Sequence, residues 1–150
     1  ESRLRQLVKE NRLSIRDFPD AHPVLAEILA VQRAIRLAEE NGVRLYIVHI
    51  SSGEAVDLLR KEQGRGSSIL GETVTHYLTL TESVYDGPEG ANMVCGPPVR
   101  TTNDLTALWR GISDDTICVI ASDHAGYSRA QKMALKAAHR WFIHAVLLIG

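Results

Sequence analysis

The chain has 150 residues, and its 17 Lys and Arg against 18 Asp and Glu give a formal net charge of -1. A content of 45% hydrophobic and 23% charged residues is typical of a globular domain and argues against disorder. The balanced charge argues against nucleic acid or an acidic membrane surface as the main partner, because both attract a basic excess. Small-molecule partners remain open.

The cysteines and the apolar stretches indicate in which cellular compartment the protein is expected. Cys95 and Cys118 lie far apart in apolar surroundings, which favours buried free thiols over a disulfide. The N-terminal residues lack the apolar core of a signal peptide, and the longest apolar stretch, residues 141–149, is too short to span a bilayer. We therefore expect a cytoplasmic protein.

The first half of the chain predicts alternating helices and strands. After a polar segment that ends in a turn near Asp20, apolar residues recur at helical spacing over residues 24–38, and Asn41-Gly42 marks the helix end. Residues 43–50 are almost continuously apolar and predict a strand buried on both faces. A second helix is predicted over residues 54–63 and a second strand over residues 68–74.

The second half continues the alternation after a long loop. Residues 79–102 contain several Gly and Pro breakers, and they precede a predicted helix over residues 105–112 and a third strand over residues 116–121. This order implies parallel strands joined by crossover helices. Residues 129–150 carry a further apolar helical stripe, and we treat them as a separate helical tail.

Polar side chains follow the first and third predicted strands. Parallel α/β barrels keep their chemistry at the carboxyl ends of the strands. His49 follows the first strand, and its imidazole would be a good ligand for a divalent transition metal. Asp123 follows the third strand, where a carboxylate can bind a metal and take a proton from metal-bound water. The alternatives are a hydrogen-bonded structural histidine and a loop-stabilising or capping aspartate.

Three other positions are weaker candidates. His124 is expected to support a ligand rather than to be one. His76 follows the second strand and could touch substrate or orient a ligand, although a loop histidine is as often merely solvated. Gly96 begins a rigid Gly-Pro-Pro turn whose backbone groups could hold an amide ring, and a purely structural turn is the alternative.

Five segments in order resemble the dihydropyrimidinase and hydantoinase branch of the cyclic amidohydrolases, across roughly residues 20 to 128. They are LYIVHISS (45–52), GETVTHYL (71–78), VCGPPVR (94–100), ALWR (107–110) and ASDH (121–124). The resemblance implies an α/β fold, a partial (β/α)8 TIM-type barrel with about strands 6 to 8, over residues 1–128. It implies an enzyme that opens dihydropyrimidine or hydantoin rings by metal-bound hydroxide at a binuclear site, usually of zinc.

The resemblance also implies roles for single residues. His49 matches the metal-binding histidine at the end of strand six, and Asp123 matches the strand-eight aspartate that binds metal and acts as general base and acid. Gly96 falls where the family usually has a serine whose main chain binds the substrate ring. His76 stands where allantoinases and dihydroorotases also have a histidine, without a fixed role, so we count it with Gly96 as substrate-binding.

Other family ligands have no counterpart in this sequence. The paired histidines of strand one, the bridging lysine of strand four and the histidine of strand five would all precede residue 20. Since a catalytic zinc needs three or more protein ligands, we expect this chain to be an inactive fragment. Three barrel strands would also leave two unpaired edges. We expect the complete protein to be a homo-oligomer acting on a small cyclic amide, with no nucleic-acid or membrane partner.

Two alternatives stay open. The first is a non-catalytic amidohydrolase-like scaffold protein, which would tend to lose metal ligands, whereas His49 and Asp123 are present. The second is a small open-sheet α/β binding module, which would pair all of its sheet edges.

Overall fold

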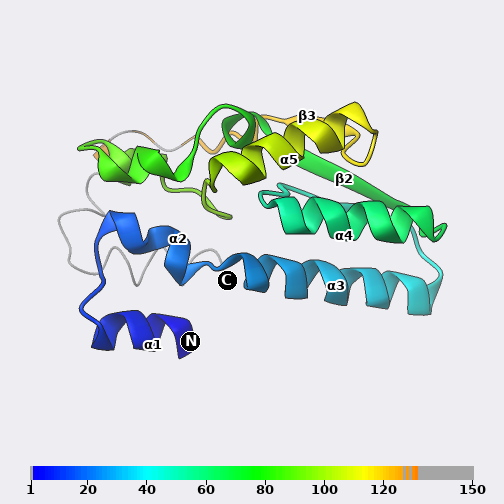
Figure 1. Ribbon diagram of the computed structural model, residues 1–150, viewed down its shortest axis with the longest axis horizontal. Helices are drawn as coiled ribbons and strands as arrows, with labels where there is room; N and C mark the ends of the chain where they lie inside the picture. The colour runs from blue at the N-terminus through cyan, green and yellow to red at the C-terminus, as the bar shows by residue number, and fades with distance from the viewer. Residues whose placement is uncertain (1, 127, 129, 132–150) are drawn as a thin grey trace.

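The computed structural model describes residues 2–126, 128 and 130–131, and its helices and strands alternate along the chain (Figure 1). In chain order they are α1 (Ser2–Lys9), α2 (Phe18–Ala21), α3 (Val24–Asn41), β1 (Leu45–Ile47), α4 (Gly53–Gly64), β2 (Ile69–Val74), α5 (Thr102–Ser113) and β3 (Val119–Ala121). Four short 3-10 helices complete the set: η1 (Ile15–Asp17), η2 (Thr75–Leu78), η3 (Glu82–Asp86) and η4 (Gly90–Met93).

The strands form one parallel sheet in the order β1-β2-β3. Leu45 lies opposite Ile69 at the start of the first pairing, and Val74 lies opposite Ala121 at the end of the second. Because neighbouring strands run parallel, α4 and α5 are the crossover connections. The predicted α/β class with parallel strands is confirmed. In the described part of the chain, β1 and β3 each pair with one strand, so each has an unpaired edge.

Helix α3 forms and ends as its sequence predicts. Val31, Ile35 and Ala38 recur at helical spacing and are buried. Gly42 follows in the left-handed region, with φ of 62°, and its N–H bonds to the carbonyls of Ala38 and Glu39. Glycine adopts this conformation without strain, which is why the helix stops there.

The two crossover helices, α4 and α5, each begin at an N-terminal cap. The Ser52 side chain accepts a hydrogen bond from the Ala55 N–H at the start of α4. At the start of α5, Thr101 and Asp104 bond reciprocally to each other's backbone N–H. This capping box stabilises the first turn, and the helix begins at Thr102. The expected start at residue 105 is therefore too late.

The core lies between the helices and one face of the sheet. Figure 1 shows α3, α4 and α5 side by side, with β2 next to α4 and α5. Fully buried apolar side chains on this side come from strand ends and from helix faces: Ile50, Ala55, Val56, Leu59, Val74 and Leu108. Tyr46 and Val48 are 46% and 42% exposed, and Leu70 and Ile120 are exposed to a similar extent. The expectation of a first strand buried on both faces is therefore wrong, because these helices pack on one face only.

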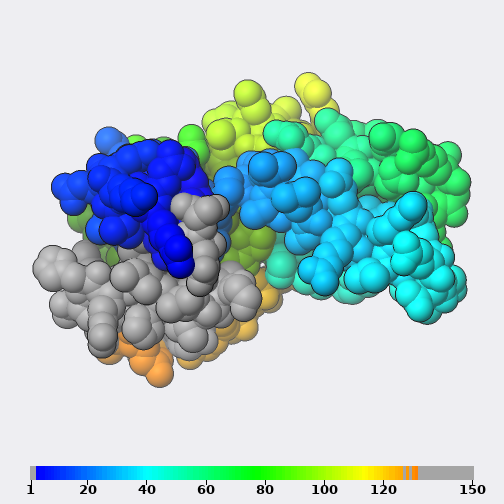
Figure 2. Space-filling model, turned by 90° about the horizontal axis from the view of Figure 1, so that it is seen from below, coloured from blue at the N-terminus to red at the C-terminus, as the bar shows by residue number. Residues whose placement is uncertain are grey.

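Three further expectations need correction or lie beyond the described residues. The polar N-terminal segment forms α1 and α2, whose Leu7 and Phe18 are completely buried, and Figure 2 shows it at the opposite end of the molecule from the C-terminal end of α3. Cys118 is exposed and Cys95 half-buried, rather than both buried. The predicted tail over residues 129–150 falls almost entirely outside the described residues. No helix within them is both long and apolar enough to cross a membrane.

Packing at Gly71 gives a direct test of the core. An added Cβ at Gly71 would lie 2.6 Å from Leu59 Cδ2 and 3.1 Å from the Thr116 carbonyl oxygen. We expect Gly71→Ala to lower the free energy of unfolding by about 1–3 kcal/mol, the usual cost of overpacking. The measurement is urea unfolding followed by circular dichroism.

Gly64→Ala is the matched control. Gly64 is the last residue of α4, and an added Cβ there meets no atom within 4 Å. Alanine at this position should raise the free energy of unfolding by about 0.4–1 kcal/mol, because it restricts the unfolded chain. An unchanged or higher urea midpoint for Gly71→Ala would contradict the packing described for β2.

Candidate functional site

His49 lies two residues beyond the end of β1, in a strained backbone conformation. Its φ is 44°, in the left-handed region that non-glycine residues rarely adopt. The conformation costs about 1–2 kcal/mol, and such residues gather at functional sites. The side chain is half-buried and lines a groove of about 420 Å³ between β1 and α3.

The turn after His49 is held by hydrogen bonds from several elements. The Ile50 N–H donates to the Glu72 carbonyl at 2.8 Å, and the Thr73 hydroxyl donates to the Ile50 carbonyl at 2.8 Å. The Gly53 N–H donates to Asp104 Oδ1 on α5 at 2.9 Å. The surrounding structure therefore fixes the position of the strained residue.

Asp123 is placed after β3 as His49 is placed after β1. It lies two residues beyond the strand, is exposed, and has φ of 45°. Because β1 and β3 belong to the same parallel sheet, both residues lie at the carboxyl edge of that sheet. Asn11 and Asp115 also have positive φ, but neither follows a strand.

The donor set for a metal ion is incomplete in the described residues. Among them, no three His, Cys, Asp or Glu side chains are grouped so that they could hold a metal ion. His49 and Asp123 would supply one nitrogen and one carboxylate ligand, which is fewer than a catalytic zinc requires. Zinc therefore does not fit these residues by themselves.

The Gly96 turn lies at the same groove as His49. The peptide between Gly96 and Pro97 is cis. The Pro97 carbonyl accepts hydrogen bonds from the Tyr77 hydroxyl at 2.5 Å and from the Cys95 thiol at 3.2 Å. Burial raises the pKa of Tyr77 far above its usual value, so this hydroxyl stays a donor at physiological pH. The Tyr77 hydroxyl and the Cys95 thiol therefore hold the turn at the Pro97 carbonyl.

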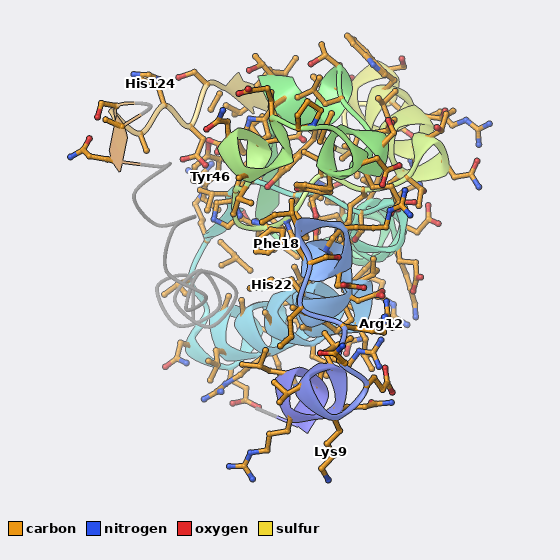
Figure 3. The ribbon with its side chains drawn as sticks, turned by 90° about the vertical axis from the view of Figure 1, so that its left-hand side faces the viewer. Lys9, Arg12, Phe18, His22, Tyr46 and His124 are labelled. Atoms are coloured by element: carbon orange, nitrogen blue, oxygen red, sulfur yellow. The ribbon has the colours of Figure 1, made fainter. Side chains whose placement is uncertain are left out.

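The two remaining histidine candidates lie elsewhere. His76 is in η2, directly after β2, and its ring packs edge-on against the Tyr77 ring with the centroids 4.4 Å apart. His124 is exposed, and Figure 3 shows it at the outer margin of the molecule, far from His22. The residues that line the groove include His49 and Gly96 but not His76 or Asp123.

Sequence reasoning misses a buried charged pair beside this groove. Arg100 and Glu27 are 6% and 8% exposed, and Arg100 Nη2 lies 3.3 Å from Glu27 Oε2. His22 lies next to them, and burial together with the Arg100 charge lowers its pKa. One signal was present: Glu27 falls beside Ile28 on the apolar stripe of α3, and a charged residue on a buried face needs a partner.

Comparisons with known proteins agree on one group of enzymes, although no protein-family model matches the chain. A dihydroorotase of Syntrophotalea carbinolica is 40% identical over 110 residues, which are 73% of this chain and 26% of the relative. An allantoinase of Solibacter usitatus is 39% identical over 132 residues, which are 87% of this chain and 29% of the relative. A D-phenylhydantoinase of Escherichia coli is 38% identical over 77% of this chain and 25% of its own length.

Solved structures of the same group have a similar fold. A dihydropyrimidinase from Brevibacillus agri matches 92% of this chain and 30% of its own with a TM-score of 0.85 and 27% identity. A D-hydantoinase from Bacillus matches 86% of this chain and 29% of its own with a TM-score of 0.81 and 32% identity. The chain thus spans between a quarter and a third of the length of these relatives. It belongs to the cyclic amidohydrolases, the group to which these dihydroorotases, allantoinases, hydantoinases and dihydropyrimidinases belong.

Proposed function

We propose that the chain is the part of a cyclic amidohydrolase barrel that contains about strands 6 to 8, and that the complete protein opens dihydropyrimidine or hydantoin rings. One observation carries the proposal: His49 and Asp123 both follow strands of the same parallel sheet, and both have a left-handed backbone. Strained residues at the carboxyl edge of such a sheet are typical of active sites in α/β barrels.

Within this proposal each candidate residue has a role. His49 and Asp123 would hold zinc together with ligands from outside the chain, and zinc, when bound, would supply an activated water. Asp123 would also act as general base toward the attacking water and as general acid toward the leaving ring nitrogen. Gly96 offers its main chain to the substrate ring, and His76 stands near the substrate side of the site. We place the complete protein in the cytoplasm as a homo-oligomer.

The exposed side of the sheet supports a larger barrel. Tyr46, Val48, Leu70 and Ile120 are large apolar residues that are between 42% and 49% exposed. Soluble proteins rarely leave such a row of strand side chains open to water. Further β/α units would cover this face and pair with the free edges of β1 and β3. Among the residues that the structure describes, these edges are unpaired, which disfavours the small open-sheet module, because that module would pair all its edges.

The isolated chain should lack activity. The described residues offer two donors, too few for a catalytic zinc site, so we expect no stoichiometric zinc and no turnover of dihydrouracil, hydantoin, allantoin or dihydroorotate. Metal analysis of the purified chain and an assay with each substrate check this expectation. Stoichiometric zinc accompanied by turnover would contradict it.

A chimera tests the roles of the two strand-end residues. Residues 24–126 would replace the equivalent segment of a D-hydantoinase, and we expect the chimera to bind zinc and open hydantoin rings. His49→Asn and Asp123→Asn remove an imidazole and a carboxylate, and asparagine tolerates the left-handed backbone. Asp123→Asn should lower kcat by about 10²–10⁴-fold, the range for loss of a general acid or base. His49→Asn should lower the zinc content and, with it, kcat, because it removes a zinc ligand.

Asp115→Asn is the matched control for the chimera. Asp115 has φ of 62° and is exposed, but it precedes β3 and so lies at the opposite edge of the sheet. This variant should keep the activity of the unmodified chimera. A folded, zinc-loaded chimera without turnover would favour the non-catalytic scaffold instead, and equal activity of all three variants would remove His49 and Asp123 from the site.

A further inference from the structure

The carboxylate of Glu27 lies at the centre of a buried hydrogen-bond network below the His49 turn. Its Oε1 accepts from the Ser51 N–H at 2.8 Å and from the Ser52 N–H at 3.2 Å. Its Oε2 accepts from the Ser51 hydroxyl at 2.6 Å and from Arg100 Nη2 at 3.3 Å. Ser51 and Ser52 are 1% and 0% exposed, so water does not compete for these bonds.

Arg100 completes the network from the other side. Its Nε donates to the Ser51 hydroxyl at 3.1 Å, and its Nη1 donates to the His22 carbonyl at 2.6 Å. The planar guanidinium thus holds Glu27, Ser51 and His22 in one arrangement. Arg100 also follows the Gly96 turn directly, so the network joins the two loops that line the groove with His49.

We infer that Glu27 is a positioning residue, which holds the left-handed backbone of His49 through Ser51 and Ser52. His49 lies two residues before Ser51, and its strained φ persists only if the following turn is fixed. All four partners of Glu27 are donors, so a side chain with two acceptor oxygens is required. The importance of this position for catalysis rests on the proposed function, whereas the backbone effect does not.

The variant Glu27→Gln tests the inference on the full 150-residue chain. Glutamine has nearly the same shape but offers one acceptor oxygen and turns an N–H₂ group toward donors. Amide hydrogen exchange at Ser51 and Ser52 should become about tenfold to a hundredfold faster, as expected for the loss of hydrogen bonds to a charged group. The HN–Hα coupling and the Cα and Cβ chemical shifts of His49 should move away from left-handed values. Nuclear magnetic resonance measures both quantities without metal or substrate.

Two further variants complete the experiment. Glu40→Gln is the control, because Glu40 lies on the same helix with its side chain 61% exposed and 3.6 Å from Arg36. It should leave Ser51, Ser52 and His49 unchanged. Ser51→Ala removes the hydroxyl bonds but keeps the backbone N–H bonds, so it should give the same changes to a smaller extent. It replaces Glu27→Gln as the test if that variant does not fold.

The outcomes separate positioning from general stability. Wild-type shifts at His49 with unchanged exchange at Ser51 would overturn the inference. Exchange that accelerates equally in all core amides, including Ile35, would also overturn it, because the effect would then be global. Local changes confined to residues 49–52 support it. None of these measurements depends on enzyme activity. If the complete protein proved inactive, the proposed function would be rejected, and the inference about Glu27 would still stand or fall on these measurements.

Discussion

One buried ion pair joins the parts of the molecule on which the candidate site depends. Glu27 on α3 and Arg100 after the Gly96 turn meet below the Ser51-Ser52 turn, far from each other in sequence. Buried charges are costly unless every hydrogen bond is made, and here the carboxylate and the guanidinium satisfy each other and the two loops. The pair therefore fixes geometry at His49 more than it adds to stability.

The sheet has two faces with different surroundings, and this asymmetry explains the rest of the structure. Helices α3, α4 and α5 bury one face, where Gly71 allows Leu59 to approach the strand closely. The other face carries exposed apolar side chains such as Tyr46 and Ile120. A parallel sheet is normally covered on both faces, so the exposed row agrees with a chain that spans between a quarter and a third of its relatives.

Local rules accounted for the order of the elements but less well for their limits. The Gly42 stop of α3 follows from the need for a left-handed residue, which glycine meets without strain. The early start of α5 was missed although Thr101 and Asp104 have the spacing of a capping box. Helices α1 and α2 were missed because they are too short for a clear period, and burial of Phe18 holds them instead.

The sequence alone was enough for the parallel α/β class, the strand-end positions of His49 and Asp123, and the resemblance to the cyclic amidohydrolases, because these depend on local periodicity and on motifs. It did not show that both residues have a left-handed backbone, that His49 shares a groove with Gly96, or that Glu27 lies under the His49 turn. Features such as the position of Glu27 arise from contacts between segments far apart in sequence, such as Glu27 with Arg100, which are 73 residues apart. Such contacts form only when the helices pack on the sheet, so no local pattern encodes them.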